Sequence, residues 1–327
     1  MKYKHLTTDS RCQIYALKSS GHRQKAIAKH LGVAASTISR ELKRNIGKHC
    51  YRYKQADRKS IDRRRTASSR PKKLIPEVIK LVELKLLQKW SPEQIAGRLR
   101  HSKIFISHAS IYRHIWADKT DGGTLYIHLR RRGKKYNHRG AATAGRGCIP
   151  DRVDISERPK IVDKKTRLGD WEGDTIIGAK HKGVILTMVD RKSKFTLLSK
   201  MNGKFAAQVP GIIKGLLNSL PCNTTDGSIT FDNGKEFSHH KEITKQTNLK
   251  CYFATPYRSW ERGLNEHTNG LVRQYCLKGT DLTTYCDEEI KYVENQLNNR
   301  PRKVLCYRTP REVFMGVKRS QKIALHC

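Results

Sequence analysis

The sequence lacks the cysteine patterns of zinc fingers and disulfide-stapled domains. It contains nine cysteines, but none forms a C-x-x-C pair or a Cys/His cluster with zinc-finger spacing. It also lacks an apolar run approaching 18 residues, and its first residues contain no apolar signal segment. These absences argue against a zinc site, a disulfide framework and a membrane partner. We therefore expect a soluble, cytoplasmic protein with reduced thiols.

Acidic side chains are also scarce. The 327 residues include 67 Lys and Arg but only 29 Asp and Glu, which gives a formal net charge of +38. Residues 1–139 hold 35 basic and 9 acidic residues, so the excess is greatest in the first part of the chain. Such a surface favours a polyanionic partner, whose binding weakens as salt rises. A solvated basic tail is the alternative, but regularly spaced apolar residues argue against it.

Residues 1–48 show the pattern of a helix-turn-helix DNA-binding domain. A short amphipathic helix over 24–31 is followed by a turn at 32–33 and a second helix over 36–44. In this reading the second helix enters the major groove. An ordinary helical hairpin would use the same apolar core, so that alternative stays open. The candidate contacts to bases or phosphates are Ser36, Thr37, Ser39, Arg40 and Arg44.

Two basic stretches flank a second helical region. Residues 49–73 are read as a basic linker, either solvated or in contact with DNA phosphate. Residues 74–118 repeat the helix-turn-helix pattern, and the helix over 107–115 carries Ser110 and Arg113 as further candidate DNA contacts. His108 and His114 are expected to face DNA or solvent rather than a metal. Residues 119–168 have no apolar period and are read as a second basic linker.

From residue 169 the pattern changes to that of an α/β domain. Strand-like runs over 171–177, 183–189 and 194–200, joined by short turns, predict an antiparallel meander. Strands over 228–231 and 250–253 then alternate with helices over 204–220, 239–247, 263–274 and 287–299. We therefore expect a multidomain protein in which an all-α, DNA-binding N-terminal part precedes an α/β domain with a mixed sheet over 169–327.

Three carboxylates of this domain have a spacing that suits phosphodiester chemistry. Asp174 lies within a strand-like run, Asp232 directly follows another, and Glu266 lies near the start of a helix. Three converging carboxylates can hold two Mg²⁺ ions, with Asp174 bridging both and Asp232 and Glu266 binding one each. The alternative is that Asp232 and Glu266 are caps, which are common at strand ends and helix starts.

The neighbouring charged residues have other expected roles. Glu172 is expected at the solvent side or rim of the site, Asp190 in a turn, and Glu236 as a local cap. Arg273 and Lys278 are predicted to bind DNA phosphate, with a salt-bridged helix surface as the alternative for both.

Several motifs of the chain resemble those of the IS-thirty family of insertion-sequence transposases, a branch of the DDE transposases and retroviral integrases. They are SPEQIA at 91–96, GDWEGDTI at 169–176, FDNGKEF at 231–237, RGLNEHTNGLVRQY at 262–275, KGTDL at 278–282 and LNNRPR at 297–302. The chain departs from the family pattern at Ser259 and Glu261, at His267, and at Cys276 and Leu277. None of these departures removes a carboxylate.

The resemblance implies an RNase H-like, integrase-type catalytic domain whose catalytic and metal-binding triad is Asp174, Asp232 and Glu266. It implies strand cleavage and strand transfer that depend on Mg²⁺, with Mn²⁺ as a substitute, at the terminal inverted repeats, through joined or circular ends. The implied partners are double-stranded DNA (terminal repeats and target) and at least one further copy of the chain, because two ends must be brought together. The implied location is the bacterial nucleoid.

Two other functions are compatible with parts of the pattern. A catalytically silent repressor of its own element would use the same helix-turn-helix, but the intact carboxylate set favours an enzyme. A non-specific RNase H-like nuclease would not explain two DNA-reading modules.

Overall fold

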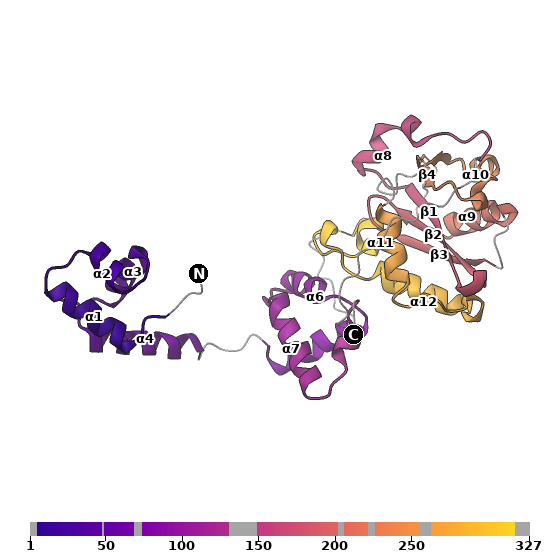
Figure 1. Ribbon diagram of the computed structural model, residues 1–327. Coiled ribbons are helices and arrows are strands. Elements are labelled where there is room, and N and C mark those ends of the chain that lie inside the picture. Colours follow the sequence, from indigo (N-terminus) through magenta and orange to yellow (C-terminus); the bar gives the residue numbers. More distant parts are fainter. Residues whose placement is uncertain are drawn as a thin grey trace. The chain divides into compact units, whose positions relative to one another are not determined.

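The computed structural model of the protein (Figure 1) describes residues 5–47, 49–68, 74–130, 149–201, 206–221, 226–255 and 263–317. The chain divides into two compact units, Met1–Lys73 and Leu74–Cys327. Within the described ranges, no helix is long and apolar enough to cross a membrane.

The first unit consists of four helices: α1 (Thr8–Ser19), α2 (Gln24–His30), α3 (Ala35–Asn45) and α4 (Tyr53–Ser68). Ile14, Ile27 and Ile38 form its buried centre, one from each of the first three helices. Gly32 follows α2 with a φ of +62°, a conformation that glycine adopts without strain, and so turns the chain towards α3. The expected helix-turn-helix is therefore present as α2 and α3, supported by α1.

Helix α4 corrects the prediction of a linker over 49–73. Tyr51 and Ala56 are buried in the same apolar core as α1–α3. The buried guanidinium of Arg11 on α1 donates to Glu41 of α3 at 2.9 Å and to Asp57 of α4 at 2.9 Å. The stretch is so basic that its few apolar contacts were not apparent from the sequence. Because of these contacts, α4 is part of the N-terminal unit.

The second unit begins with the helices α5 (Pro76–Leu87), α6 (Pro92–Leu99) and α7 (His108–Thr120). Ser91 starts α6 through a capping box with Gln94, and the Ser107 side chain caps α7. These helices share a core that includes Val82, Ile95 and Ile111. The second helix-turn-helix-like region therefore has a core of its own.

The prediction of a linker over 119–168 is wrong at both ends. The short helix η2 (Leu125–His128) packs on α5 and α7, and Ile149 lies in the core of the α/β part. A short helix α8 (Lys160–Lys164) follows, anchored by the buried Val162. Residues 131–148, which carry the Arg/Lys and Gly/Ala stretches, lie outside the described residues.

A five-stranded mixed sheet forms the centre of the α/β part, with strand order β3-β2-β1-β4-β5. Its strands are β1 (Asp170–Ile177), β2 (Val184–Asp190), β3 (Thr196–Met201), β4 (Ser228–Phe231) and β5 (Lys250–Phe253). The pairs β1–β2 and β2–β3 are antiparallel, as the meander predicts, whereas β1–β4 and β4–β5 are parallel. This mixed sheet is consistent with an RNase H-like fold.

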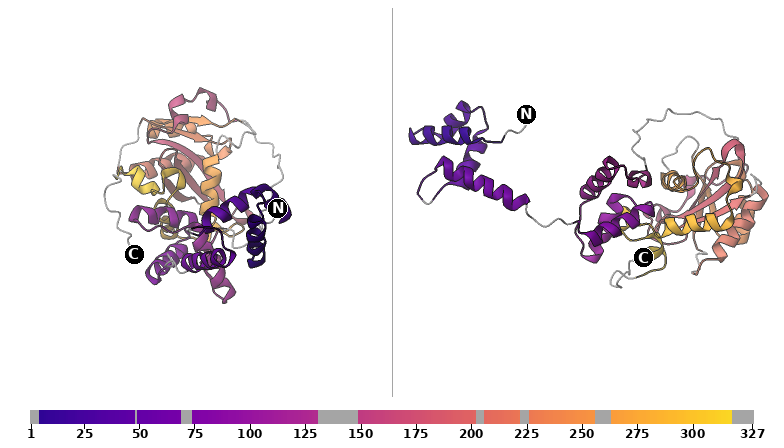
Figure 2. Two further views of the ribbon diagram at one scale, coloured as in Figure 1. Left: turned by 90° about the vertical axis from the view of Figure 1, so that its left-hand side faces the viewer. Right: turned by 90° about the horizontal axis from the view of Figure 1, so that it is seen from below.

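Helices cover both faces of this sheet. On one face lie α9 (Val209–Asn218) and α10 (His240–Thr247), which share a core with Trp171, Phe231 and Phe253. On the other face, α11 (Gly263–Val272) and α12 (Asp287–Asn298) pack on Ile176, Ile185 and Leu198. Figures 1 and 2 show α12 alongside the sheet. A last short helix, α13 (Pro310–Phe314), places Phe314 against Trp171 and Phe195.

The second helical region is docked on the C-terminal part of the α/β domain. Arg98 of α6 forms a buried, two-bond ion pair with Glu312 of α13. The Tyr307 ring lies directly on α6, because a Cβ at Gly97 would come within 2.2 Å of it. Lys89 adds a hydrogen bond of 2.7 Å to the Gln274 carbonyl. Helices α5–α7 and the sheet therefore belong to one packed unit.

Candidate active site

The alternation along β1 places its acidic side chains on the face of the sheet covered by α11. Asp170 pairs with Ser228 in the β1–β4 register, and Glu172 pairs with Thr230. Continuing this parallel register by two residues brings Asp174 opposite Asp232, directly beyond the end of β4. Adjacent strands lie about 4.8 Å apart. The sheet therefore places the two predicted strand carboxylates side by side.

A glycine makes this arrangement possible. Gly173 separates Glu172 from Asp174, and a Cβ there would lie only 2.4 Å from Cε1 of Phe231. The Phe231 ring therefore crosses β1 at the one residue without a side chain. It stacks on Phe237, with ring centroids 4.2 Å apart, and is fully buried. The residue that immediately precedes Asp232 is thus fixed by packing against β1.

Helix α11 is anchored to the same point of β1 by two asparagines. The Asn265 side chain donates to the Gly173 carbonyl at 3.2 Å, and the Asn269 side chain donates to Oδ2 of Asp174 at 2.7 Å. Thr187 on β2 donates to the Asp174 carbonyl and to Oδ1 of Asn269. Neither Thr187 nor Asn265 was singled out from the sequence, because their role depends on how α11 packs on the sheet.

Glu266 lies between these two asparagines in the first turn of α11, and its side chain is exposed. Within the part of the chain that the structure describes, no group of three or more His, Cys, Asp or Glu side chains is arranged to hold a metal ion. The segment that leads into α11, including Ser259 and Glu261, lies outside the described residues. The structure thus brings Asp174 and Asp232 together, while the full triad with Glu266 stays a prediction.

The donor atoms at this end of the sheet fit a hard divalent cation by type. Asp174 and Asp232 supply carboxylate oxygens from adjacent strands, and Glu266 can supply more from the helix pinned above them. Mg²⁺ prefers such oxygen ligands and is commonly held by one or two carboxylates together with substrate phosphates. Oδ1 of Asp174 accepts from the Thr175 amide at 2.9 Å, and Oδ1 of Asp232 accepts from the Gly234 amide at 2.9 Å.

A buried ionic network lies directly below the two aspartates. Glu172 is buried and accepts a hydrogen bond of 3.0 Å from Arg191, so the expected rim position of Glu172 is wrong. Arg158 donates to Thr230 at 2.9 Å and forms an ion pair with Asp163. Burial lowers the pKa of Arg191, and the charge of Glu172 opposes that shift. Glu172 and Asp174 share one face of β1, but Glu172 is buried against Arg191, whereas Asp174 is only half-buried.

Asp190 has the turn role that its sequence position predicts. Its carboxylate accepts hydrogen bonds from the Gly169 and Ser193 amides and from the Ser193 hydroxyl. Burial raises the pKa of Asp190, while its hydrogen bonds with Ser193 and Gly169 act in the opposite direction. Asp190 therefore closes the β2–β3 turn.

Glu236 is more than a local cap. Its Oε1 accepts from the Thr175 hydroxyl at 2.7 Å, which joins the short helix after Asp232 to β1 beside Asp174. Gly234 makes room for this contact, since a Cβ there would lie 2.6 Å from Oε2 of Glu236 and 2.8 Å from Oδ1 of Asp232. Glu236 thus lies beside the candidate site and fixes the loop that carries Asp232.

The two predicted phosphate contacts after α11 differ in their surroundings. Arg273 donates to the carbonyls of Ile177, at 2.6 Å, and of Leu277, at 3.3 Å. Its guanidinium therefore ties the end of β1 to the C-terminal end of α11, and its predicted contact with phosphate stays a prediction. Lys278 is exposed, so its predicted contact with phosphate remains open.

The candidate DNA contacts of the first unit lie on the outer side of α3. Ser36, Ser39, Arg40 and Arg44 are exposed and Thr37 is partly exposed, whereas Ile38 and Leu42 are buried in the core. Arg40 folds back on its own helix through a hydrogen bond of 3.0 Å to the Ser36 carbonyl. The outer side of α3 therefore presents hydroxyl and guanidinium groups, as a recognition helix does.

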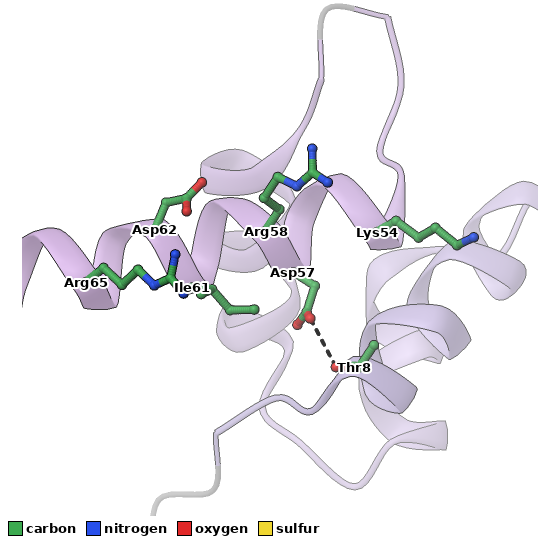
Figure 3. Close-up of a pocket in the computed structure, with 7 residues that line it drawn as sticks. All are labelled: Thr8, Lys54, Asp57, Arg58, Ile61, Asp62 and Arg65. Carbon is green, nitrogen blue, oxygen red and sulfur yellow. Dashed lines mark hydrogen bonds between the residues drawn. The ribbon is translucent and has the colours of Figure 1, made fainter.

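A shallow cavity of about 440 Å³ lies elsewhere in this unit, between α1 and α4 (Figure 3). Lys54, Arg58 and Arg65 line it together with Asp57, which accepts a hydrogen bond of 3.1 Å from Thr8. It contains none of the predicted site residues.

The other two predicted DNA contacts, Ser110 and Arg113, lie on helix α7. Arg113 is exposed and donates to the partly exposed Ser110 at 3.2 Å. His114 instead turns towards α5, where its Nε2 lies 2.8 Å from Glu83. The expectation that His114 faces DNA or solvent is therefore wrong, because Glu83 holds it against the neighbouring helix.

Comparison with known proteins agrees with this architecture. The family model "Helix-turn-helix domain" matches residues 2–45. The chain is 47% identical over 325 residues to "Transposase for insertion sequence element IS4351" of Bacteroides fragilis, with 98% of each chain covered. It is 38% identical over 326 residues to "Transposase InsI for insertion sequence element IS30A" of Escherichia coli (strain K12), covering 95% of this chain and 83% of the relative.

The chain belongs to the IS30 family of insertion-sequence transposases. A third relative, "Transposase for insertion sequence element IS1086" of Cupriavidus metallidurans, is 36% identical over 328 residues and covers 97% and 96% of the two chains. The family resemblance read from the motifs is thus confirmed. Of the departures from the IS30-family pattern, His267 lies on α11 beside Glu266, and the exposed Leu277 follows that helix.

Proposed function

We propose that this IS30-family protein is a DNA transposase that binds the terminal inverted repeats of its element and catalyses Mg²⁺-dependent strand cleavage and strand transfer through joined or circular ends. The observation that supports the proposal is the β1–β4 register, which when continued by two residues sets Asp174, within β1, beside Asp232, just beyond β4, next to the helix that bears Glu266. The net charge of +38 and the outward helices α3 and α7 support double-stranded DNA as the substrate.

The side chains around the carboxylates prepare them for metal binding. Asn269 and the Thr175 amide each hold one oxygen of Asp174, and the Gly234 amide holds one oxygen of Asp232. These bonds fix the direction of both carboxylates before DNA arrives. When bound, Mg²⁺, or Mn²⁺ in its place, would supply charge neutralisation at the reacting phosphate and activation of the attacking oxygen. Asp174, Asp232 and Glu266 would hold it.

In this proposal, helices α3 and α7 recognise the DNA. Helices α3 and α7 would each lie in a major groove, so that the repeat is read at two places. Two element ends must meet for joining, and each chain carries one carboxylate set. We therefore infer that at least two copies of the chain act together on the two ends.

The test uses purified protein, Mg²⁺ and DNA that carries the terminal repeat of its element. Asp232→Asn should bind the repeat as wild type does but lose cleavage and joining by at least 100-fold, because a metal-holding carboxylate is gone. Asp287→Asn, at an exposed carboxylate on α12, is the matched control and should keep full activity. Cleavage by Asp232→Asn at the wild-type rate would refute the mechanism. A wild-type protein that binds the repeat and never cuts it would instead be a repressor.

A further inference from the structure

A cluster of arginines surrounds the part of α11 that follows Glu266. Arg130 comes from the chain just after η2, and Arg300 and Arg302 come from the LNNRPR motif after α12. None of the three has a role in the carboxylate site described above. Arg130 and Arg300 are both close enough to Arg302 for their charges to act on it.

Arg130 lies against α11 itself. A Cβ built on Gly270 would be 2.5 Å from Nη2 of Arg130, so this guanidinium occupies the space that a side chain at 270 would fill. Gly270 is four residues after Glu266, which places it one helical turn further along the same side of α11. Arg130 is also exposed, and can therefore be reached from outside.

The other two arginines are buried behind it, and among the described residues neither has an acidic partner. Arg300 is 3% exposed and donates to two neutral amides, Oε1 of Gln94 at 2.8 Å and Oε1 of Gln274 at 2.6 Å. Arg302 is 6% exposed, and its Nη2 donates to the Leu297 carbonyl at 3.2 Å. Its Nε and Nη1 atoms are buried, with no hydrogen-bond partner in the part of the chain that the structure describes. Among the described residues, no Asp or Glu forms an ion pair with any of the three arginines.

Electrostatic effects agree with this geometry. Burial, together with repulsion from Arg300 and Arg130, lowers the pKa of Arg302 to about 9. Several cations held together without a counter-charge are costly, and an anion that reaches the cluster removes this cost.

We propose that Arg130, backed by the buried Arg300 and Arg302, forms a phosphodiester-binding site on α11, one turn beyond Glu266. The site rests on the proposed function in taking DNA as the ligand. Arg130 contacts the phosphate directly, and the two buried guanidiniums add their field from behind. The site holds the DNA backbone next to the carboxylates, which makes it a part of the substrate-binding surface that is separate from α3 and α7.

Two variants test the site without disturbing the buried arginines. Arg130→Gln removes the exposed charge. Gly270→Ala keeps that charge but displaces the guanidinium, while alanine itself favours the helix. The matched controls lie on α9, on the other face of the sheet: Lys214→Gln removes an exposed charge, and Gly211→Ala adds a methyl group where nothing lies within 4 Å.

The measurement is the affinity of the full chain for a short duplex that carries the terminal repeat, in the absence of divalent metal and over a range of KCl concentrations. One lost phosphate contact reduces the slope of log K against log salt by about 0.9. When salt rises from 50 to 200 mM, the variant should therefore lose roughly 3.5-fold less affinity than wild type loses. We expect this reduction for Arg130→Gln and for Gly270→Ala. The double variant should show no further reduction, because both changes act on one guanidinium.

Slopes for both variants equal to wild type would overturn the site, as would a double variant that loses twice the single effect. The test is independent of catalysis. Cleavage with unchanged slopes refutes this site alone, whereas reduced slopes in a protein that never cleaves refute the proposed chemistry and support the site.

Discussion

Gly173→Ala tests whether the packing of Phe231 sets the position of the two aspartates. The added Cβ would lie 2.4 Å from Cε1 and 2.7 Å from Cδ1 of the Phe231 ring. The ring cannot withdraw freely, since it is fully buried and stacked on Phe237. The change therefore pushes on β4 directly before Asp232.

Two opposing effects determine how much Gly173→Ala changes the free energy of unfolding. Overpacking a buried site costs about 1–3 kcal/mol. Replacing glycine by alanine restricts the unfolded chain and returns about 0.4–1 kcal/mol. We therefore expect a net loss of about 1–2 kcal/mol in the free energy of unfolding. For a unit of this size, each kcal/mol lowers Tm by about 2–4 °C.

The assay combines thermal unfolding, repeat binding and cleavage. Gly173→Ala should lower Tm, keep repeat binding and reduce cleavage by more than the loss of folded protein explains. Gly211→Ala is the control, because nothing lies within 4 Å of its added methyl group. Combining Gly173→Ala with Phe231→Leu should cost less than the sum of the single changes, since leucine lacks the clashing ring atoms. Unchanged stability together with additive single and double variants would refute the reasoning.

Two further predictions concern the charges around β1. Glu172→Gln removes the buried partner of Arg191 at 3.0 Å and leaves it the more exposed Asp163 at 3.5 Å. We expect the free energy of unfolding in urea to fall by about 3 kcal/mol, and a fall of less than about 1 kcal/mol would contradict this. Burial, with repulsion from Lys165, lowers the pKa of Lys194 to about 8, from an ordinary value near 10.5 in the unfolded chain. Between pH 8 and pH 10.5 the unfolded chain therefore binds more protons at Lys194, so its contribution to stability rises with pH, by at most about 1.4 kcal/mol per pH unit. Lys194→Met should remove this rise, and equal pH profiles for the two proteins between pH 8 and pH 10 would contradict it.

Local patterns in the sequence predict much of the α/β domain. The runs that become β1, β2 and β3 alternate or are continuously apolar, and their short turns allow only antiparallel pairing. The placement of Asp174 and Asp232 also follows from local patterns, because Asp174 lies within one strand and Asp232 just beyond the end of another. Strand alternation further places Glu172 on the same face as Asp174.

What could not be predicted depends on contacts between distant segments. Glu172 is buried with its carboxylate bonded to Arg191, 19 residues later in the chain. The sequence of α4 resembles a linker, and its place in the fold depends on the bond between Asp57 and Arg11, 46 residues earlier. The anchoring of α11 through Asn265 and Asn269 likewise appears only when the helix lies on the sheet. Charge and periodicity carry no information about such pairs.

The docking of α6 on α13 determines how the protein can measure DNA. The buried Arg98–Glu312 pair and the Tyr307 ring on Gly97 tie α7 and the carboxylates into one unit. If α7 contacts bases as proposed, the protein fixes the number of base pairs between those bases and the cleaved phosphate. Base pairs inserted between the bases contacted by α7 and the cleaved phosphate should therefore shift the cut relative to those bases.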